Sequence, residues 1–143
     1  MEVIKLKQID VIYNMFLHKI NDPDILEYYT EEEMQLDCDM SIRMVLGKLV
    51  YFDIDYDDVT REFSRKLNNT EMVMLSCGLV LEWLSPQIYT IDLIKQNMTS
   101  SEFNSTSKAN QLKALMELSN KAKNEMNTLY IQNGYKDGIP KIK

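Results

Sequence analysis

Residues 70–86 constrain the fold of this chain more than any other stretch of its sequence. Met, Val, Leu, Cys and Trp fill the segment, and only Ser76, Gly78 and Glu82 interrupt the apolar run between residues 71 and 84. A helix that is apolar on nearly all sides has no face that suits water, so other elements must surround it. We therefore predict that this segment is the central helix of the fold. Four of its residues are expected to belong to the structural core: Leu75, Leu79, Trp83 and Pro86.

Sequence signals mark both ends of this helix. The side chain of Thr70 can accept a bond from the first free backbone N–H groups, and Glu71 suits the positive end of the helix dipole. Ser85 followed by Pro86 indicates a new N-cap with proline at the first helical position. We therefore expect the central helix to stop at this point and a second helix to span residues 86–98.

Apolar residues recur at helical spacing in three further segments. Residues 1–21 contain an amphipathic helix, and residues 30–50 contain a second one that Thr30 and three glutamates begin as a capping box. Residues 107–133 form the longest helix, which at ~1.5 Å per residue is about 40 Å long, so one end is expected to project. The predicted inward stripe of the second helix is Met34, Cys38, Ile42, Val45 and Leu49, and that of the last helix is Leu112, Leu115, Ser119, Ala122, Met126 and Leu129.

The remaining segments complete an all-α prediction. The acidic loop 51–58 is expected to cap a short helix over residues 59–67, and the polar residues 99–107 are expected to form a loop. The chain has 143 residues, 45% of them hydrophobic, with four Gly and three Pro. These features predict a single-domain helical bundle of about five to six helices over residues 1–134, followed by an extended C-terminal tail at 135–143.

The sequence holds little that indicates catalysis. His18 is the one histidine, and no glycine-rich phosphate loop or Gly-x-Ser-x-Gly motif occurs. Cys38 and Cys77 lie within apolar patterns without a metal-binding spacing, so we expect reduced core thiols. The chain is therefore not expected to be an enzyme or to hold a cofactor. Because no signal peptide and no apolar run of ~18 residues is evident, we expect a soluble protein made in a reducing cytoplasm, without contact to a membrane.

Acidic residues are concentrated in residues 22–62, which hold thirteen acidic residues against three basic ones, a balance of −10, in a chain of net charge −6. A nucleic-acid clamp would need a basic stripe instead. Four aspartates of this segment resemble the start of a calcium loop: Asp53, Asp55, Asp57 and Asp58. The Gly and Glu that such a loop requires are replaced by Asp58 and Ser64. We interpret these residues as a solvated acidic loop without a metal, and a metal-dependent activity stays the minor alternative.

Two segments resemble a family of small helical virion proteins of tailed bacteriophages, the head–tail connectors. They are EFSRKLNNTEMVMLSCGLVLEWLSPQI and SKANQLKALMELSNKAKNEMNTLY. The first carries Phe63 and Leu67 before a Thr-Glu helix start, then Gly78, and then the corner Glu-Trp-Leu-Ser-Pro-Gln-Ile at residues 82–88. The second begins with a Ser-x-Ala-Asn motif at residues 107–110. The resemblance spans residues 30–130 of this chain.

This resemblance implies an adaptor or neck protein located in the virion, at the head–tail interface. Such subunits form a homo-oligomeric ring, commonly twelvefold, beneath the portal protein. The ring extends the DNA channel, carries another neck or tail protein, and lets double-stranded DNA pass without specific binding. The four aspartates given above are then the channel-facing candidates. The expected contacts with partners are at the end of the last helix and in the tail: Tyr130, Tyr135, Ile139, Pro140, Lys141, Ile142 and Lys143.

The acidic segment leaves a second hypothesis open. An acidic, phage-encoded regulatory or inhibitor protein that mimics DNA would bind a basic host partner in a salt-sensitive manner. Such a protein would be absent from purified virions, whereas a connector would be present in them.

Overall fold

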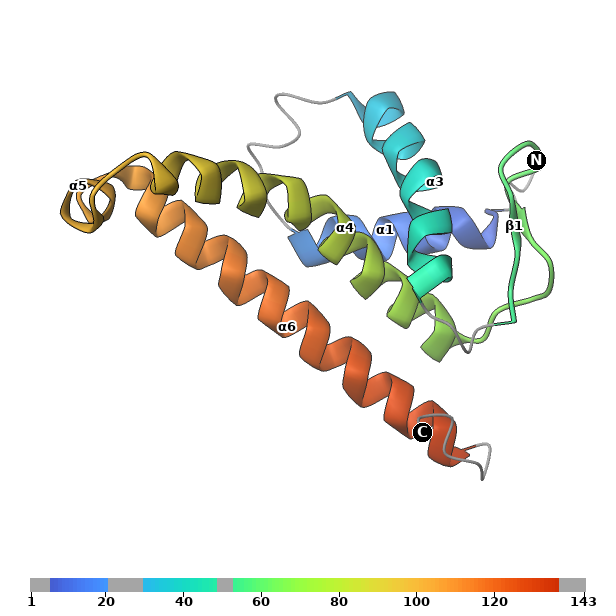
Figure 1. Cartoon of the computed structure of the whole chain (residues 1–143). Helices are drawn as coiled ribbons and strands as arrows, with labels where there is room; N and C mark the ends of the chain where they lie inside the picture. The colour runs from blue at the N-terminus through green and yellow to red at the C-terminus, as the bar shows by residue number, and fades with distance from the viewer. Residues whose placement is uncertain (1–5, 21–29, 49–52, 137–143) are drawn as a thin grey trace.

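The computed structural model of the chain describes residues 6–20, 30–48 and 53–136, with side chains up to residue 132. Within these residues the chain forms five helices and one two-stranded sheet. In chain order they are α1 (Gln8–Ile20), α3 (Glu31–Lys48), β1 (Tyr56–Asp57), β2 (Glu62–Phe63), α4 (Asn69–Gln96), α5 (Ser100–Asn104) and α6 (Ser107–Lys136). The predicted all-α fold with a long last helix is confirmed (Figure 1).

Helix α4 lies at the centre of the fold and packs against α1, α3 and α6 (Figure 1). It is buried without interruption from Met74 to Val80, and the exposed fractions of Leu75 and Leu79 are 0% and 2%. Trp83 is half-buried and meets the ring of Phe16 edge-on at 6.2 Å between centroids. By length and composition alone α4 could cross a membrane, but half of its most apolar window is buried inside the domain. Packing on its neighbours therefore accounts for its apolar character.

The prediction that Pro86 stops the central helix is wrong, because α4 continues through Pro86 to Gln96. Proline removes one backbone donor, which leaves the carbonyl oxygen four residues earlier without its helical partner. Pro86 is exposed, so it does not belong to the core, and water can reach this side of the helix. On either side of it Gln87 Nε2 donates to the carbonyl oxygen of Trp83 at 3.0 Å, and Thr90 Oγ1 donates to that of Pro86 at 2.8 Å. Figure 1 shows α4 as one continuous curved helix.

The N-cap of α4 is Asn68 rather than Thr70. Asn68 Oδ1 accepts the backbone N–H of Glu71 at 2.8 Å, and Glu71 Oε1 accepts the backbone N–H of Asn68 at 3.0 Å. Arg65 Nη1 donates to the same carboxylate at 3.0 Å. These donors allow Glu71 to be only 4% exposed. The helix thus begins with an Asn-x-x-Glu capping box, two residues earlier than predicted.

Residues 59–67 do not form the predicted short helix. Instead β2 pairs antiparallel with β1, and Tyr56 lies opposite Phe63. Before the turn, Ile54 and Tyr56 are buried while the aspartates next to them are exposed. This alternation has the period of two that is typical of an extended strand. The Asp57 carboxylate, which was expected to cap a helix, therefore accepts backbone N–H groups in the turn of a hairpin.

The segment 99–107 was predicted to be a loop, but it contains the short helix α5. Thr99 is its N-cap, and Glu102 completes a capping box with the backbone N–H of Thr99. Phe103 supplies the apolar contact, since it is 3% exposed and lies below the Nζ of Lys95 at 5.4 Å. One aromatic residue and one capping box were enough to order this connection.

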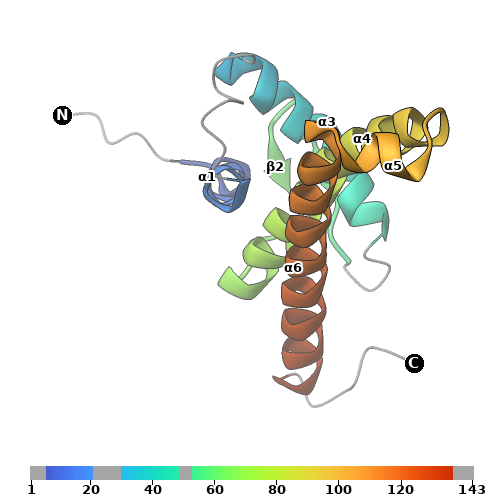
Figure 2. The same cartoon turned by 90° about the vertical axis from the view of Figure 1, so that its left-hand side faces the viewer.

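Helices α4 and α6 run side by side and are joined through α5 (Figures 1 and 2). The predicted stripe of α6 faces inward, with Ser119 and Ala122 buried and the other four residues half-buried. The prediction that α6 ends before Gly134 is wrong by one turn, because it continues to Lys136. Thirty residues at ~1.5 Å each give a length of about 45 Å. The C-terminal end of α6 extends past the other helices, as predicted (Figure 2).

Gly78 lies where α3 and α6 both approach α4. A Cβ at this position would be 2.4 Å from Val45 Cγ1 on α3 and 3.3 Å from Met126 Cε on α6. The first distance is too short for two carbon atoms, so α3 can pack this closely only because residue 78 has no side chain. Gly47 on α3 provides a contrast, because no atom lies within 4 Å of its Cβ position.

We expect Gly78→Ala to lower the free energy of unfolding by about 1–2 kcal/mol, because overpacking against Val45 outweighs the gain in helix propensity. Gly47→Ala is the matched control, and the same gain without a clash should raise the free energy by about 0.5–1 kcal/mol. Urea denaturation of both variants measures these changes. A Gly78→Ala protein as stable as the native one would show that α3 does not pack closely at this point.

Candidate interaction surfaces

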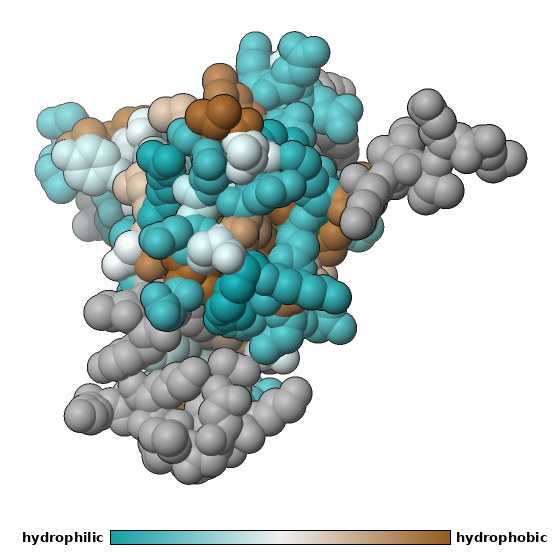
Figure 3. All heavy atoms as spheres, turned by 90° about the vertical axis from the view of Figure 1, so that its right-hand side faces the viewer, coloured by the Kyte–Doolittle hydropathy of each residue, from teal (hydrophilic) through white to brown (hydrophobic). Residues whose placement is uncertain are grey.

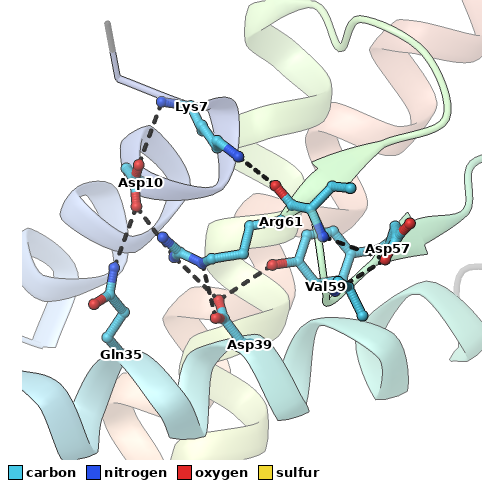
Figure 4. Close-up of polar contacts among 9 residues, drawn as sticks. Lys7, Asp10, Gln35, Asp39, Asp57, Val59 and Arg61 are labelled. Atoms are coloured by element: carbon cyan, nitrogen blue, oxygen red, sulfur yellow. Dashed lines mark hydrogen bonds and ion pairs between the residues drawn. The ribbon is translucent and has the colours of Figure 1, made fainter. Parts of the chain in front are cut away.

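Arg61 ties the β-hairpin to two helices (Figure 4). Its guanidinium donates to Asp39 on α3, with Nε at 2.9 Å from Oδ2 and Nη2 at 3.2 Å from Oδ1, and Nη2 lies 3.1 Å from Oδ1 of Asp10 on α1. Tyr56 O–H donates to Asp39 Oδ1 at 3.2 Å, and Gln35 lies beside both Asp10 and Arg61. All three charged side chains are less than a third exposed. One cation thus joins α1, α3 and the hairpin.

The backbone of Arg61 adopts a left-handed conformation, with φ of 57°. For a residue other than glycine this conformation costs roughly 1 kcal/mol, so the contacts of its side chain must offset the strain. Loss of solvent, followed by the charge of Asp39, raises the pKa of the Tyr56 hydroxyl. Tyr56 therefore stays protonated and serves as a donor within this cluster at neutral pH.

The four aspartates proposed to face a DNA channel are all exposed, and they lie along the hairpin. Two of them have local roles. The Asp57 carboxylate accepts the backbone N–H groups of Val59 at 2.9 Å and Thr60 at 3.4 Å, and these bonds lower its pKa. Asp58 pairs with Arg43 on α3 at 3.1 Å. Asp53 and Asp55 remain as solvent-facing charges, and the side of the molecule near the hairpin is mostly hydrophilic (Figure 3).

No group of three or more metal-ligating side chains comes together within residues 6–20, 30–48 and 53–136. The reactive sulfur atoms are buried, since Cys38 and Cys77 are 4% and 0% exposed. Burial raises the pKa of the Cys38 thiol to about 12, with a further contribution from Asp39, and raises that of Cys77 to about 11. Both thiols are therefore protonated and inaccessible at neutral pH.

Helix α3 carries a second apolar stripe that faces away from the core. Leu36, Met40 and Met44 recur every four residues, and their exposed fractions are 63%, 66% and 57%. The stripe predicted to face inward is indeed buried from Met34 to Val45, and Leu49 lies outside the described residues. We define the outer face of α3 as Glu33, Leu36, Asp37, Met40, Met44 and Gly47. An exposed apolar face on this helix was not predicted, although the four-residue spacing of Leu36, Met40 and Met44 is visible in the sequence.

Helix α6 presents a different kind of surface. On the side turned away from its buried stripe, exposed residues recur in steps of three and four. We define this outer face of α6 as Lys113, Met116, Asn120, Lys123, Asn127 and Ile131. The exposed fractions of Met116 and Ile131 are 42% and 46%. This face is thus basic with two apolar residues, whereas the outer face of α3 is apolar with two acids.

A groove of about 740 Å³ opens between α1, α4 and α6. Its apolar walls are Leu6, Val11, Met15, Val73, Val80, Leu118 and Ala122. Lys19 Nζ binds both carboxylate oxygens of Glu125 at 2.9 Å across its edge. His18 lies at the same edge, with Nδ1 2.8 Å from the carbonyl oxygen of Asn14. The groove is therefore an apolar cleft. The hydrogen-bond partner of His18 in it is a backbone carbonyl oxygen, which is not a nucleophile that a histidine could activate.

The predicted partner-binding residues are only partly placed. Tyr130 is half-buried on α6, and Tyr135 lies in the last turn of α6. Residues 139–143 of the predicted docking tail lie outside the described residues. The structure therefore joins the two tyrosines to the projecting end of α6 and leaves the tail as a sequence-based prediction.

We expect Arg61→Met to lower the free energy of unfolding by about 1–3 kcal/mol, because Asp10 and Asp39 lose a shared cation in a place with little water. Arg43→Met is the matched control. Its partner Asp58 and Arg43 itself are 53% and 57% exposed, so the loss should be at most about 0.5 kcal/mol. Thermal denaturation followed by circular dichroism compares the two variants. Equal losses would mean that the Arg61 cluster contributes no more than an exposed ion pair.

Comparison of the chain with protein-family models, with curated proteins and with solved structures gave no match.

Proposed function

We propose that this protein is a structural virion protein of a tailed bacteriophage, a head–tail connector subunit that assembles into a ring beneath the portal protein. The observation that carries the proposal is the outer face of α3. A stable domain does not need three large apolar side chains on the solvent side of a helix whose other side already fills the core. Such a face is typical of a surface that another protein covers.

The resemblance of residues 82–88 and 107–110 to connector proteins narrows this general inference to the virion neck. In the structure the corner at residues 82–88 lies within the continuous helix α4, between its buried middle and its exposed distal half. This stretch is thus part of one continuous helix that packs on α6. A subunit that repeats around a ring needs such a rigid element, because small errors in its angle accumulate around the ring.

Two further features fit this role. The projecting end of α6, which leads into the basic and apolar tail, suits docking to a portal or to the next neck component. The exposed carboxylates of Asp53 and Asp55 suit a channel surface that repels DNA phosphates. These features extend the proposal to the portal, to a second neck or tail protein, and to passing double-stranded DNA.

The alternative function, an acidic inhibitor of a basic host protein, has less support. DNA mimicry requires a dense array of free carboxylates. In the hairpin the carboxylate of Asp57 closes a turn and that of Asp58 is paired with Arg43. On α3, the carboxylate of Asp39 binds Arg61. The acidic segment is thus divided between structural roles and solvent.

We expect mass spectrometry of purified particles of the encoding phage to detect this protein at a constant ratio to the portal protein. An abundant nonstructural phage protein serves as the control for contamination. Absence of the protein from clean particles would contradict the connector role and would favour the inhibitor.

Deletion of residues 138–143 is expected to leave the melting temperature unchanged, because α6 ends at Lys136. Affinity for isolated portal rings should fall by at least about tenfold, which corresponds to ~1.4 kcal/mol. A variant that carries the same six residues in scrambled order controls for charge alone. Mass photometry of mixtures with the portal measures binding, and undiminished binding of the truncated protein would remove the tail from the docking surface.

A further inference from the structure

We propose that the outer face of α3 in one copy of this protein binds the outer face of α6 in the next copy. This contact rests on the proposed ring function and specifies how neighbouring subunits recognise each other. It assigns a partner to the two surfaces defined above.

The need for a partner is strongest at α3. Leu36, Met40 and Met44 are each more than half exposed and form a continuous apolar line along the helix. Gly47 continues this line with open space above it, so a second helix can approach closely at that end. Methionine side chains adapt to irregular surfaces, which suits a contact that must form repeatedly between identical subunits.

Charge selects α6 as the partner. Helix α3 has five acidic and two basic residues, a net charge of −3, whereas α6 has two acidic and five basic residues, a net charge of +3. On the two outer faces, Glu33 and Asp37 oppose Lys113 and Lys123. None of these four charged groups forms an ion pair with another residue in the part of the chain that the structure describes. They are available to pair with each other across an interface.

The two faces also match in length and in apolar content. The α3 face runs from Glu33 to Gly47 and the α6 face from Lys113 to Ile131, which at ~1.5 Å per residue are about 21 Å and 27 Å long. Met116 and Ile131 provide apolar contacts, and the aliphatic stems of the lysines can cover the methionines of α3. The α6 face is therefore long enough to receive the whole α3 face.

The position of α4 makes this contact one between different copies. Val45 of α3 and Met126 of α6 both approach Gly78 of α4, and the residues of both outer faces are exposed and take no part in that contact. Helix α4 lies between α3 and α6 (Figure 1), so the two faces of one copy do not meet each other. A contact between two unlike faces is heterologous, so each subunit passes the contact on to the next one. A closed chain of such contacts is a ring.

A charge-exchange experiment tests this contact. The α3 variant carries Glu33→Lys with Asp37→Lys, and the α6 variant carries Lys113→Glu with Lys123→Glu. All four residues are exposed, so both variants should fold. The α6 variant should keep the native melting temperature, whereas the α3 variant should lose at most about 1 kcal/mol, because Glu33 lies in the first turn of α3. Sedimentation equilibrium up to about 1 mM protein detects weak association of the kind that a templated ring would use. Lys108→Glu with Lys121→Glu, both exposed and outside the outer face of α6, lowers the net charge by the same four units and is the control for the α6 variant.

Each variant alone should self-associate roughly tenfold to a hundredfold more weakly than the native protein, because like charges then face each other. An equimolar mixture of the two variants should recover association, since every α3 face then meets an α6 face of opposite charge. Met40→Asp should also weaken association, because it places a charge in the apolar line of α3. Mixing the Met40→Asp protein with the α6 variant should not restore its association.

Three outcomes would overturn the contact. They are a native protein that stays monomeric at the highest concentration, variants that associate like the native protein, and a mixture that does no better than its components. The second or third outcome would indicate that α3 is covered by another part of the chain or by a different protein. Detection of the protein in purified particles is independent of these results, so the connector role can stand while this contact fails.

Discussion

The close approach of α3 and α6 to α4 at Gly78 is the constraint on which the rest of the structure depends. Val45 and Met126 converge on a residue without a side chain, and the buried middle of α4 is enclosed as a result. Dense packing of this kind fixes the positions of helices to within fractions of an ångström. The two helices that meet there are also the two whose outer faces we assign to contacts between subunits, so the core determines where those faces point.

The polar interactions of the protein serve mainly to hold connections in place. The Arg61 cluster fixes the hairpin to α1 and α3, and the Asn68–Glu71 capping box begins α4. Asp39 of the acidic segment is used in this way, whereas Asp53 and Asp55 face solvent. The exposed charges on the outer faces of α3 and α6 have opposite signs.

The proposed function and the proposed contact share one observation, the exposed apolar face of α3, and differ in the others. The virion role rests on the resemblance at residues 82–88 and 107–110 and on an apolar face that a monomer would leave in water. The contact between α3 and α6 rests on exposure, helical spacing and charge. Together they describe a subunit with a rigid helical core, two unlike faces for its neighbours, and a projecting helix for the next component of the neck.

The sequence by itself determined the helical class, the central position of residues 70–84, the inward stripes of α3 and α6, and the presence of a long last helix, though not its end at Lys136. Those features follow from apolar periodicity, which is a local property. Tertiary structure decided the conformation of the segments in which long-range contacts opposed the local sequence signals. Helix α4 continues through Pro86, which is exposed to water and flanked by the side-chain bonds of Gln87 and Thr90. The hydrogen bonds of Arg61 and Asp57 hold a hairpin in residues expected to be helical, and Phe103 is buried in α5. Helix α3 has two apolar sides, and only the structure decided which of them is exposed, because that depends on the positions of the neighbouring helices.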